Sequence, residues 1–174
     1  MEVMLRAAFL LLCLTLAGCA TTSVTGPQTY SDGGITFFLP AKWKITMQGR
    51  TQGCSNAFVE APGAAVLFIQ GLPISQDPGL TKFAADFSPM ATPNVSQAKV
   101  TAARPVTFSD PRYGTCLREK FTVATSGEKV SHTRTYRALR FDSCVYYLVT
   151  QVADEDAAAA SRGFDEILRS FKGK

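Results

Sequence analysis

The sequence predicts an α+β domain in which helices pack on one antiparallel β-sheet, and three observations support this class. Short apolar segments separated by turn residues fill most of the 174-residue chain after residue 30. The segment from 95 to 153 is rich in predicted strands, and apolar and polar side chains alternate from Leu117 to Val123, which is typical of a strand with one buried face. The chain closes with a helical pattern whose apolar stripe is Phe164, Ile167, Leu168 and Phe171. Runs of strands combined with separate helices indicate the α+β class.

Two strands are predicted at the beginning of the domain. Ile35–Leu39 is rich in β-branched and aromatic residues and lies between a Ser-Asp-Gly-Gly turn and Pro40. Trp43–Met47 is a second predicted strand of the same kind. The next residues, from Gly49 to Asn56, are mostly polar and predict a loop that contains Cys54.

A hairpin and a helix follow. Ala57–Val59 and Ala65–Ile69 flank an Ala-Pro-Gly turn, which predicts a β-hairpin. Asp77 followed by Pro78 is typical of a helix start, with aspartate as the N-cap and proline at the first position. Pro89 is expected to end this helix. Its apolar stripe consists of Leu80, Phe83, Ala84 and Phe87.

The middle of the chain predicts an antiparallel meander. A two-residue turn at Ser126-Gly127 fixes its register. This register pairs Val123 with Val130, Phe121 with His132, Glu119 with Arg134, and Leu117 with Tyr136. The same alternation places Arg118, Lys120 and Arg137 together on the opposite face.

The last strand and the last helix complete the domain. Cys144–Val152 follows a turn near Asp142-Ser143. Its odd-numbered and even-numbered positions are both apolar, as expected for a strand that is covered on both faces. The acidic run from 154 to 156 precedes the final helix, and Arg169 and Lys172 lie at its end, which complements the helix dipole. This arrangement explains the three acids better than a metal site does.

The N-terminus predicts export and lipidation rather than a part of the fold. Residues 1–18 combine a short charged start with a ten-residue apolar run, which is too short for a permanent membrane-spanning helix. The run ends in Leu-Ala-Gly followed by Cys19, which resembles the lipobox of bacterial lipoproteins. Residues 19–30 then form a lipidated polar tether, and residues 31–174 form a single domain. Residue 20 is Ala rather than Asp, which favours the periplasmic face of the outer membrane by the sorting rule of enteric-type envelopes.

The remaining cysteines allow at most one disulfide. Three cysteines follow Cys19, and no CxxC motif is present. In the predicted register Cys116 and Cys144 share a face but are offset by about 13 Å, at ~3.3 Å per residue, which is too far for a bond. Cys54 is therefore expected to pair with either Cys116 or Cys144.

The two ends of the domain resemble a known family. A strand that leads into Phe-Leu-Pro-Ala-Lys-Trp at 38–43, and a last helix reading Phe-Asp-Glu-Ile-Leu-Arg-Ser-Phe-Lys at 164–172, resemble the PsbP/Mog1-like domains. Small bacterial lipoproteins of the DcrB type are similar as well. Many family members have Gly before the Trp, where this chain has Lys42. The resemblance covers about residues 30–174 and implies a Mog1/PsbP-like α/β/α sandwich, without any catalytic residue to carry over.

These observations favour a non-catalytic role. His132 is the only histidine, and its strand position indicates a structural side chain. A net charge of +4 is modest and does not indicate nucleic-acid binding. No cofactor or metal site is expected. The resemblance implies an envelope accessory or assembly factor that binds a protein partner, and the alternative is a small-ligand-binding or hydrolytic periplasmic lipoprotein. The basic surface formed by Arg118, Lys120 and Arg137 is our hypothesis for a docking site, and its ligand could be anionic lipid headgroups, anionic glycans or an acidic protein partner.

Overall fold

The computed structural model describes residues 26–91, 99–102, 104–125 and 128–174. The expected signal peptide, Cys19 and the turn at 126–127 lie outside these residues. The strands are β1 Gln28–Asp32, β2 Ile35–Leu39, β3 Lys44–Thr51, β4 Cys54–Glu60, β5 Ala65–Pro73, β6 Lys99–Ala102, β7 Val106–Asp110, β8 Gly114–Thr125, β9 Glu128–Arg140 and β10 Cys144–Ala153. The helices are the short 3₁₀ turn η1 Ile74–Gln76, α1 Leu80–Ala91 and α2 Ala157–Ser170.

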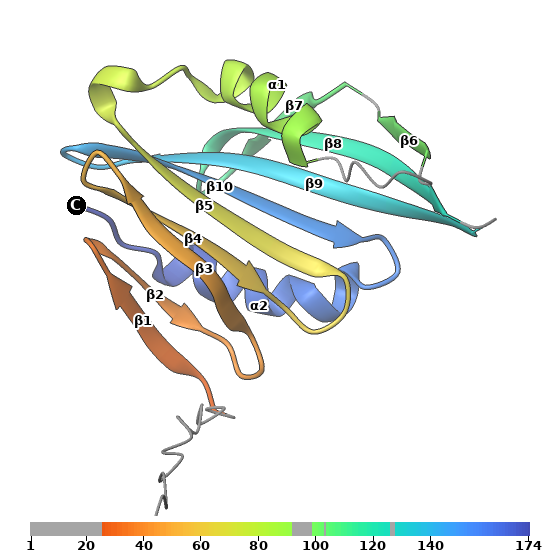
Figure 1. Ribbon diagram of the computed structural model, residues 1–174, viewed down its shortest axis with the longest axis horizontal. Helices are drawn as coiled ribbons and strands as arrows, with labels where there is room; N and C mark the ends of the chain where they lie inside the picture. Colours follow the sequence, from red (N-terminus) through yellow and green to blue (C-terminus); the bar gives the residue numbers. More distant parts are fainter. Residues whose placement is uncertain (1–25, 92–98, 103, 126–127) are drawn as a thin grey trace, which may run out of the picture.

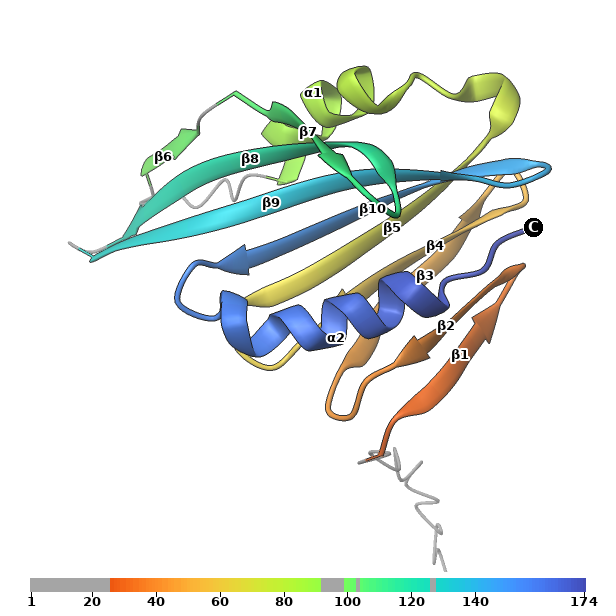
Figure 2. The same cartoon turned by 180° about the vertical axis from the view of Figure 1, so that it is seen from behind.

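One large antiparallel sheet organises the domain. Its strand order is β3-β4-β5-β10-β9-β8-β6, and β7 also pairs with β8. Strands β1 and β2 form a separate hairpin beside it. Figures 1 and 2 show α1 on one face of the sheet and α2 on the other. The predicted α+β sandwich is therefore confirmed.

Two hydrophobic clusters hold the helices on the sheet. On the α2 face, Trp43 packs edge-on against Phe164 with ring centroids 5.1 Å apart. On the α1 face, Phe83 stacks on Tyr147 at 3.9 Å. Strand β10 lies between the clusters and is buried at nearly every position, as its unbroken apolar sequence predicts. The predicted β8–β9 register is also confirmed, with Phe121 opposite His132 and the other three pairs in place.

The loop predicted between Gly49 and Asn56 is wrong, because β3 continues to Thr51 and β4 begins at Cys54. A tight turn joins them, and Gln52 and Gly53 both have positive φ, 49° and 87°. The polar residues of β3 are exposed because the strand forms the edge of the sheet. Polarity here reflects an uncovered strand rather than an irregular one.

Both helices differ from the prediction at their ends. Helix α1 begins at Leu80, and the carboxylate of Asp77 instead accepts the Gly79 N–H at 2.8 Å and the Tyr147 hydroxyl. Pro89 lies inside α1, close enough to its end that the missing N–H interrupts only the last turn. Helix α2 ends at Ser170, before the lysine expected in its last turn.

The N-terminal boundary of the fold also lies earlier than expected. Strand β1 includes residues 28–30, which were assigned to the tether, and it pairs along its whole length with β2. The Tyr30 ring packs on Phe37 with centroids 4.8 Å apart. None of the helices in the described part of the chain has the length and apolarity needed to cross a bilayer.

Cys54 and Cys144 form a disulfide with a Cα–Cα distance of 6.0 Å, and Cys116 is free and buried. The structure thus contains one of the two pairings left open by the sequence. The bond joins β4 to β10 across the intervening strand β5, beside Gly71. A Cβ at Gly71 would lie 2.9 Å from the Cβ of Cys54, so glycine leaves the room that the bond needs.

Candidate functional site

An open groove lies on the α1 face of the sheet, over β3, β4 and β5. Helix α1 packs against β8 and β9, which leaves this end of the face uncovered. The groove has a volume of about 600 Å³. Its lining residues are Met47, Gln48, Gly49, Arg50, Asn56, Ala57, Phe58, Phe68, Ile69, Gln70 and Phe87.

Aromatic rings form the floor and one end of the groove. Phe58 and Phe68 are cross-strand neighbours on β4 and β5, with centroids 4.5 Å apart. Phe87 of α1 meets Phe68 edge-on at 5.2 Å and forms the end wall. Met47 lies opposite Phe58 on β3 and is 69% exposed. A flexible thioether beside aromatic rings suits a surface that adapts to an apolar ligand.

The edge strand β3 borders the groove over four consecutive residues, 47–50. Among the described strands, β3 pairs only with β4. Its outer edge therefore carries backbone N–H and C=O groups without a strand partner, and such edges accept additional strands. The groove thus combines an apolar floor with an open hydrogen-bonding edge.

Arg50 is the one ionisable side chain that lines the described groove, and it pairs with Asp32 at 3.2 Å. An arginine stays protonated in proteins and cannot act as a general base. The lining residues include no carboxylate, imidazole or thiol. The polar side chains of the lining are thus one guanidinium and three amides.

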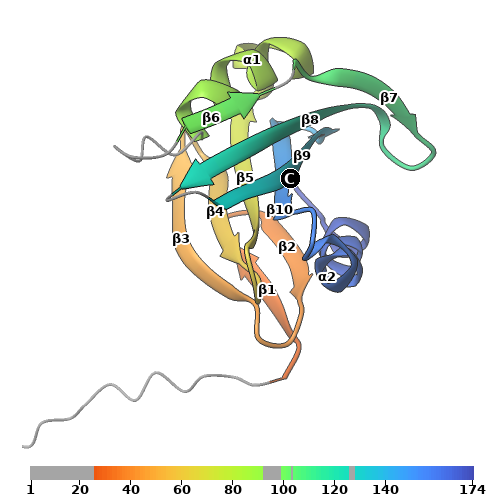
Figure 3. The same ribbon diagram turned by 90° about the vertical axis from the view of Figure 1, so that its right-hand side faces the viewer.

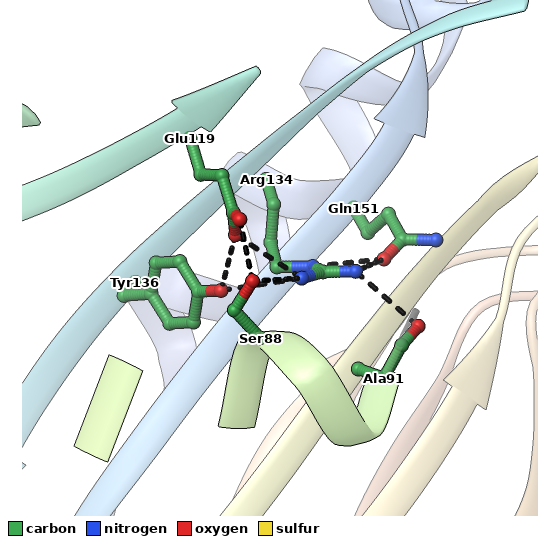
Figure 4. Close-up of polar contacts among 6 residues, drawn as sticks. All are labelled: Ser88, Ala91, Glu119, Arg134, Tyr136 and Gln151. Atoms are coloured by element: carbon green, nitrogen blue, oxygen red, sulfur yellow. Dashed lines mark hydrogen bonds and ion pairs between the residues drawn. The ribbon is translucent and has the colours of Figure 1, made fainter. Parts of the chain in front are cut away.

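A buried polar cluster lies between the sheet and the end of α1 that carries Ser88 and Ala91 (Figure 4). Arg134 of β9 and Glu119 of β8 form an ion pair at 3.1 Å, and their side chains are 0% and 2% exposed. Glu119 also accepts the Tyr136 hydroxyl at 2.6 Å, while Gln151 accepts Arg134 Nη2 at 2.7 Å. Burial, reinforced by the hydrogen bond to Glu119, raises the pKa of Tyr136 to about 12.

The cluster fastens the end of α1 to the sheet. Arg134 donates to the Ala91 carbonyl at 3.3 Å, and Ser88 of the helix donates its hydroxyl to Glu119. The guanidinium carbon of Arg134 also lies 5.8 Å from the centroid of the Phe87 ring. The ion pair is closed to solvent, so we interpret the cluster as the support that positions the Phe87 wall.

The basic residues singled out in the sequence lie on the face of β8 and β9 that points away from α1. Arg118 and Lys120 are exposed, and Arg137 is half-buried. The Arg118 guanidinium lies 4.5 Å from the centroid of the Phe108 ring, and that of Arg137 lies 5.5 Å from Tyr113. The structure therefore brings the three predicted docking residues onto one surface.

The other residues considered from the sequence, which are the histidine, the free cysteine and the acidic run at 154–156, have contacts typical of structural side chains. His132 is half-buried, stacks on Phe121 at 5.0 Å, and has Nδ1 3.2 Å from the Val130 carbonyl oxygen. Burial raises the pKa of the Cys116 thiol, which lowers its reactivity. Asp156 accepts the Ala64 N–H at 2.9 Å. The described residues contain no group of three or more side chains suited to hold a metal ion.

Sequence reasoning missed both the groove and the cluster. Phe58 and Phe68 have the alternation of an ordinary buried strand face, and no local pattern indicates that α1 leaves them uncovered. The Glu119–Arg134 pair was visible in the predicted register. An acid opposite a base on the apolar side of a hairpin was the signal that could have identified it.

No family model matches the chain, and no curated protein matches it. Two solved structures are similar to it. The solution structure of cyanobacterial PsbP (CyanoP) from Synechocystis sp. PCC 6803 has a TM-score of 0.52 at 13% identity, covering 91% of this chain and 99% of that one. LpqN of Mycobacterium tuberculosis, involved in cell envelope biogenesis, has a TM-score of 0.43 at 12% identity, covering 84% and 88%. The likeness to CyanoP confirms the PsbP-like fold. At this level of sequence identity the likeness concerns the fold and carries no information about function.

Proposed function

We propose that the chain is a membrane-anchored envelope lipoprotein that acts as a non-catalytic accessory or assembly factor and binds a protein partner in the groove. One observation carries the proposal: the groove is apolar, open, bordered by an edge strand and free of acids, bases and nucleophiles among its lining residues. Proteins seldom leave such aromatic surfaces uncovered unless another molecule packs on them.

The edge strand favours a polypeptide as the ligand. An extended segment can add to the free side of β3 and form main-chain hydrogen bonds with it. Alternate side chains of that segment would then point toward the aromatic floor, because successive side chains of a strand point to opposite faces. Phe58 and Phe68 would receive an apolar side chain, and Met47 would close over it.

The anchor follows from the lipobox-like sequence that ends at Cys19. Several acyl chains on one cysteine hold a protein at a bilayer almost permanently, since each buried methylene contributes about 0.8 kcal/mol. The alanine at position 20 supports the periplasmic face of the outer membrane. We expect wild-type protein to incorporate labelled palmitate and fractionate with membranes. Cys19→Ser protein should do neither, and unchanged labelling would remove the anchor from the proposal.

Two exposed methionines give a matched test of the groove. Met47 is 69% exposed on the groove rim, and Met90 is 76% exposed on α1 outside it. Met47→Lys adds a charge to the binding surface, whereas Met90→Lys adds the same charge elsewhere. After chemical crosslinking in intact cells, Met47→Lys should lose the specific protein adducts of wild type and Met90→Lys should keep them. Equal adducts from both variants would contradict the site.

A small apolar ligand is the second candidate, because a volume of about 600 Å³ lies within the range of small-molecule pockets. Native mass spectrometry of the purified full chain distinguishes the two. A defined small molecule that co-purifies with wild type, and is lost in Met47→Lys but not in Met90→Lys, would favour the ligand-binding alternative.

A further inference from the structure

The face of β8 and β9 that lies opposite α1 carries four cations, one more than the sequence singled out. Arg118 pairs with Thr135, Lys120 with Thr133, and Lys129 with Ala124. Because side chains alternate between faces, these cations and Arg137 all belong to one surface. We refer to Arg118, Lys120, Lys129 and Arg137 together as the basic face. Hydroxyl side chains lie between them, at Thr122, Ser131, Thr133 and Thr135.

The strands of the basic face contribute no carboxylate to that side. Glu119 lies on the α1 side of the sheet together with Arg134. Glu128 lies an even number of residues before Arg134 on β9, so it belongs to the α1 side as well. Two acids border the face, but their carboxylates already have donors. Asp154 accepts the Thr133 hydroxyl at 2.7 Å, and Asp110 accepts two backbone N–H groups at 2.9 and 3.3 Å. With four cations on the face and two carboxylates at its border, the face has an excess of positive charge.

The cations of the basic face have no carboxylate partner among the described residues. Six cations elsewhere lie within ion-pair distance of a carboxylate, whereas none of the four does so among the described residues. Arg137 shows the deficit most clearly. Its Nε and Nη1 atoms are buried and have no hydrogen-bond partner in the described part of the chain.

We propose that the basic face binds an acidic polypeptide segment of a protein partner. Arg118 and Lys120 are two residues apart on β8, a spacing of ~6.6 Å that matches alternate side chains of an extended chain laid along the strands. The guanidinium of Arg118 lies over the Phe108 ring at an exposed position, and an arginine there can bind a carboxylate in a bidentate manner. The hydroxyls of Thr122 and Ser131, which lie between the cations, can donate to the same carboxylates.

The position of the face favours a polypeptide over the bilayer. Figures 1 and 3 show β8 at the end of the molecule away from β1, the described strand that is nearest to Cys19 in the sequence. Figure 2 shows this side of β8 and β9 outside the area covered by α2. The half-buried Arg137 is also more accessible to a single side chain than to a flat layer of headgroups. This proposal concerns the opposite face of the sheet from the groove and does not depend on it.

The test compares charge reversal on the face with charge reversal elsewhere, in the full chain held in zwitterionic detergent micelles. The face variant combines Arg118→Glu, Lys120→Glu and Lys129→Glu, all at exposed positions. The control variant reverses three other exposed lysines, Lys42→Glu, Lys44→Glu and Lys172→Glu. A third variant keeps the charges of the face but exchanges the side chains, as Arg118→Lys, Lys120→Arg and Lys129→Arg.

The probes are poly-L-glutamate, dihexanoyl phosphatidylglycerol and polygalacturonate, measured by calorimetry at low and high salt. We expect wild type, the control and the charge-preserving variant to bind poly-L-glutamate, with an affinity that falls as salt rises. The face variant should bind it roughly tenfold more weakly or worse, as the loss of several exposed charge pairs implies. The proposal is overturned by no binding to wild type, by equal loss in the control, or by stronger binding of the lipid or the glycan.

Discussion

Removal of the carboxylate of Glu119 should destabilise the fold strongly, because the charge of Arg134 would remain buried without its counterion. Glu119 is 2% exposed and accepts hydrogen bonds from Arg134, Tyr136 and Ser88. Breaking one partner of a buried pair costs about 3–5 kcal/mol. Three lost bonds to a charged acceptor, at about 1.5–3 kcal/mol each before relaxation, are consistent with the upper part of that range. We therefore expect Glu119→Leu to lower the free energy of unfolding by about 4 kcal/mol.

The matched control removes both charges. In the double variant Glu119→Leu and Arg134→Met, no buried charge remains, and replacing a buried pair by apolar side chains of similar size is often neutral. Urea denaturation of the full chain, followed by circular dichroism, gives both values. We expect the double variant to regain most of the loss. A cost below about 1 kcal/mol for Glu119→Leu would show that water or a rearranged Arg134 replaces the carboxylate, and would refute the reasoning.

Three further changes test other parts of the structure. Cys54→Ser should destabilise the protein by about 4–5 kcal/mol in urea, because the disulfide closes a separation of 90 residues, whereas Cys116→Ser should have a small effect. Burial alone would raise the pKa of Asp77, but its hydrogen bonds and a neighbouring arginine outweigh that effect and lower it below the ordinary 3.8. Its contribution to stability is therefore complete above about pH 5 and is lost as the pH falls through the lowered value. Asp77→Asn should remove this part of the acid sensitivity measured by thermal unfolding, and an unchanged pH profile would count against it. Gly163→Ala should lower Tm despite the better helix propensity of alanine, because its Cβ would lie 2.3 Å from the Trp43 ring, and an unchanged or higher Tm would contradict this packing.

The parts of the fold that the sequence predicted are those specified by local patterns. Alternation of side chains in 117–123, together with a short turn, was enough to place Phe121 opposite His132 and Glu119 opposite Arg134. The unbroken apolar run from Cys144 identified the central strand. In both cases the signal lies within one or two adjacent strands, so no knowledge of the tertiary arrangement was needed.

The errors arose where tertiary packing decides the outcome. The polar stretch after Met47 forms the edge strand β3, because one side and much of both faces remain in solvent and tolerate polar residues. The Asp77-Pro78 pair looked like a helix start, but the carboxylate bonds to Tyr147 and Gly79 instead, and the helix begins later.

The groove could not be predicted from the sequence, because the residues of its floor follow the same apolar and polar alternation as an ordinary buried strand face. Phe58 and Phe68 would be core side chains if α1 lay over β4 and β5. They line a groove because Phe83 stacks on Tyr147 of β10 and the Arg134 cluster holds the end of the helix, which together direct α1 to the other half of the sheet. Information of that kind resides in long-range contacts rather than in any local motif.

Site-specific photo-crosslinking in intact cells tests the central claim, partner binding at the groove, most directly. A photoreactive amino acid replaces Met47 on the groove rim, and in a second strain it replaces Met90 on the outer side of α1. We predict light-dependent adducts with a defined polypeptide from position 47 and not from position 90, with the crosslinked peptide in an extended segment of the partner. Identical adducts from both positions, or adducts from position 47 that contain no second polypeptide, would contradict the account.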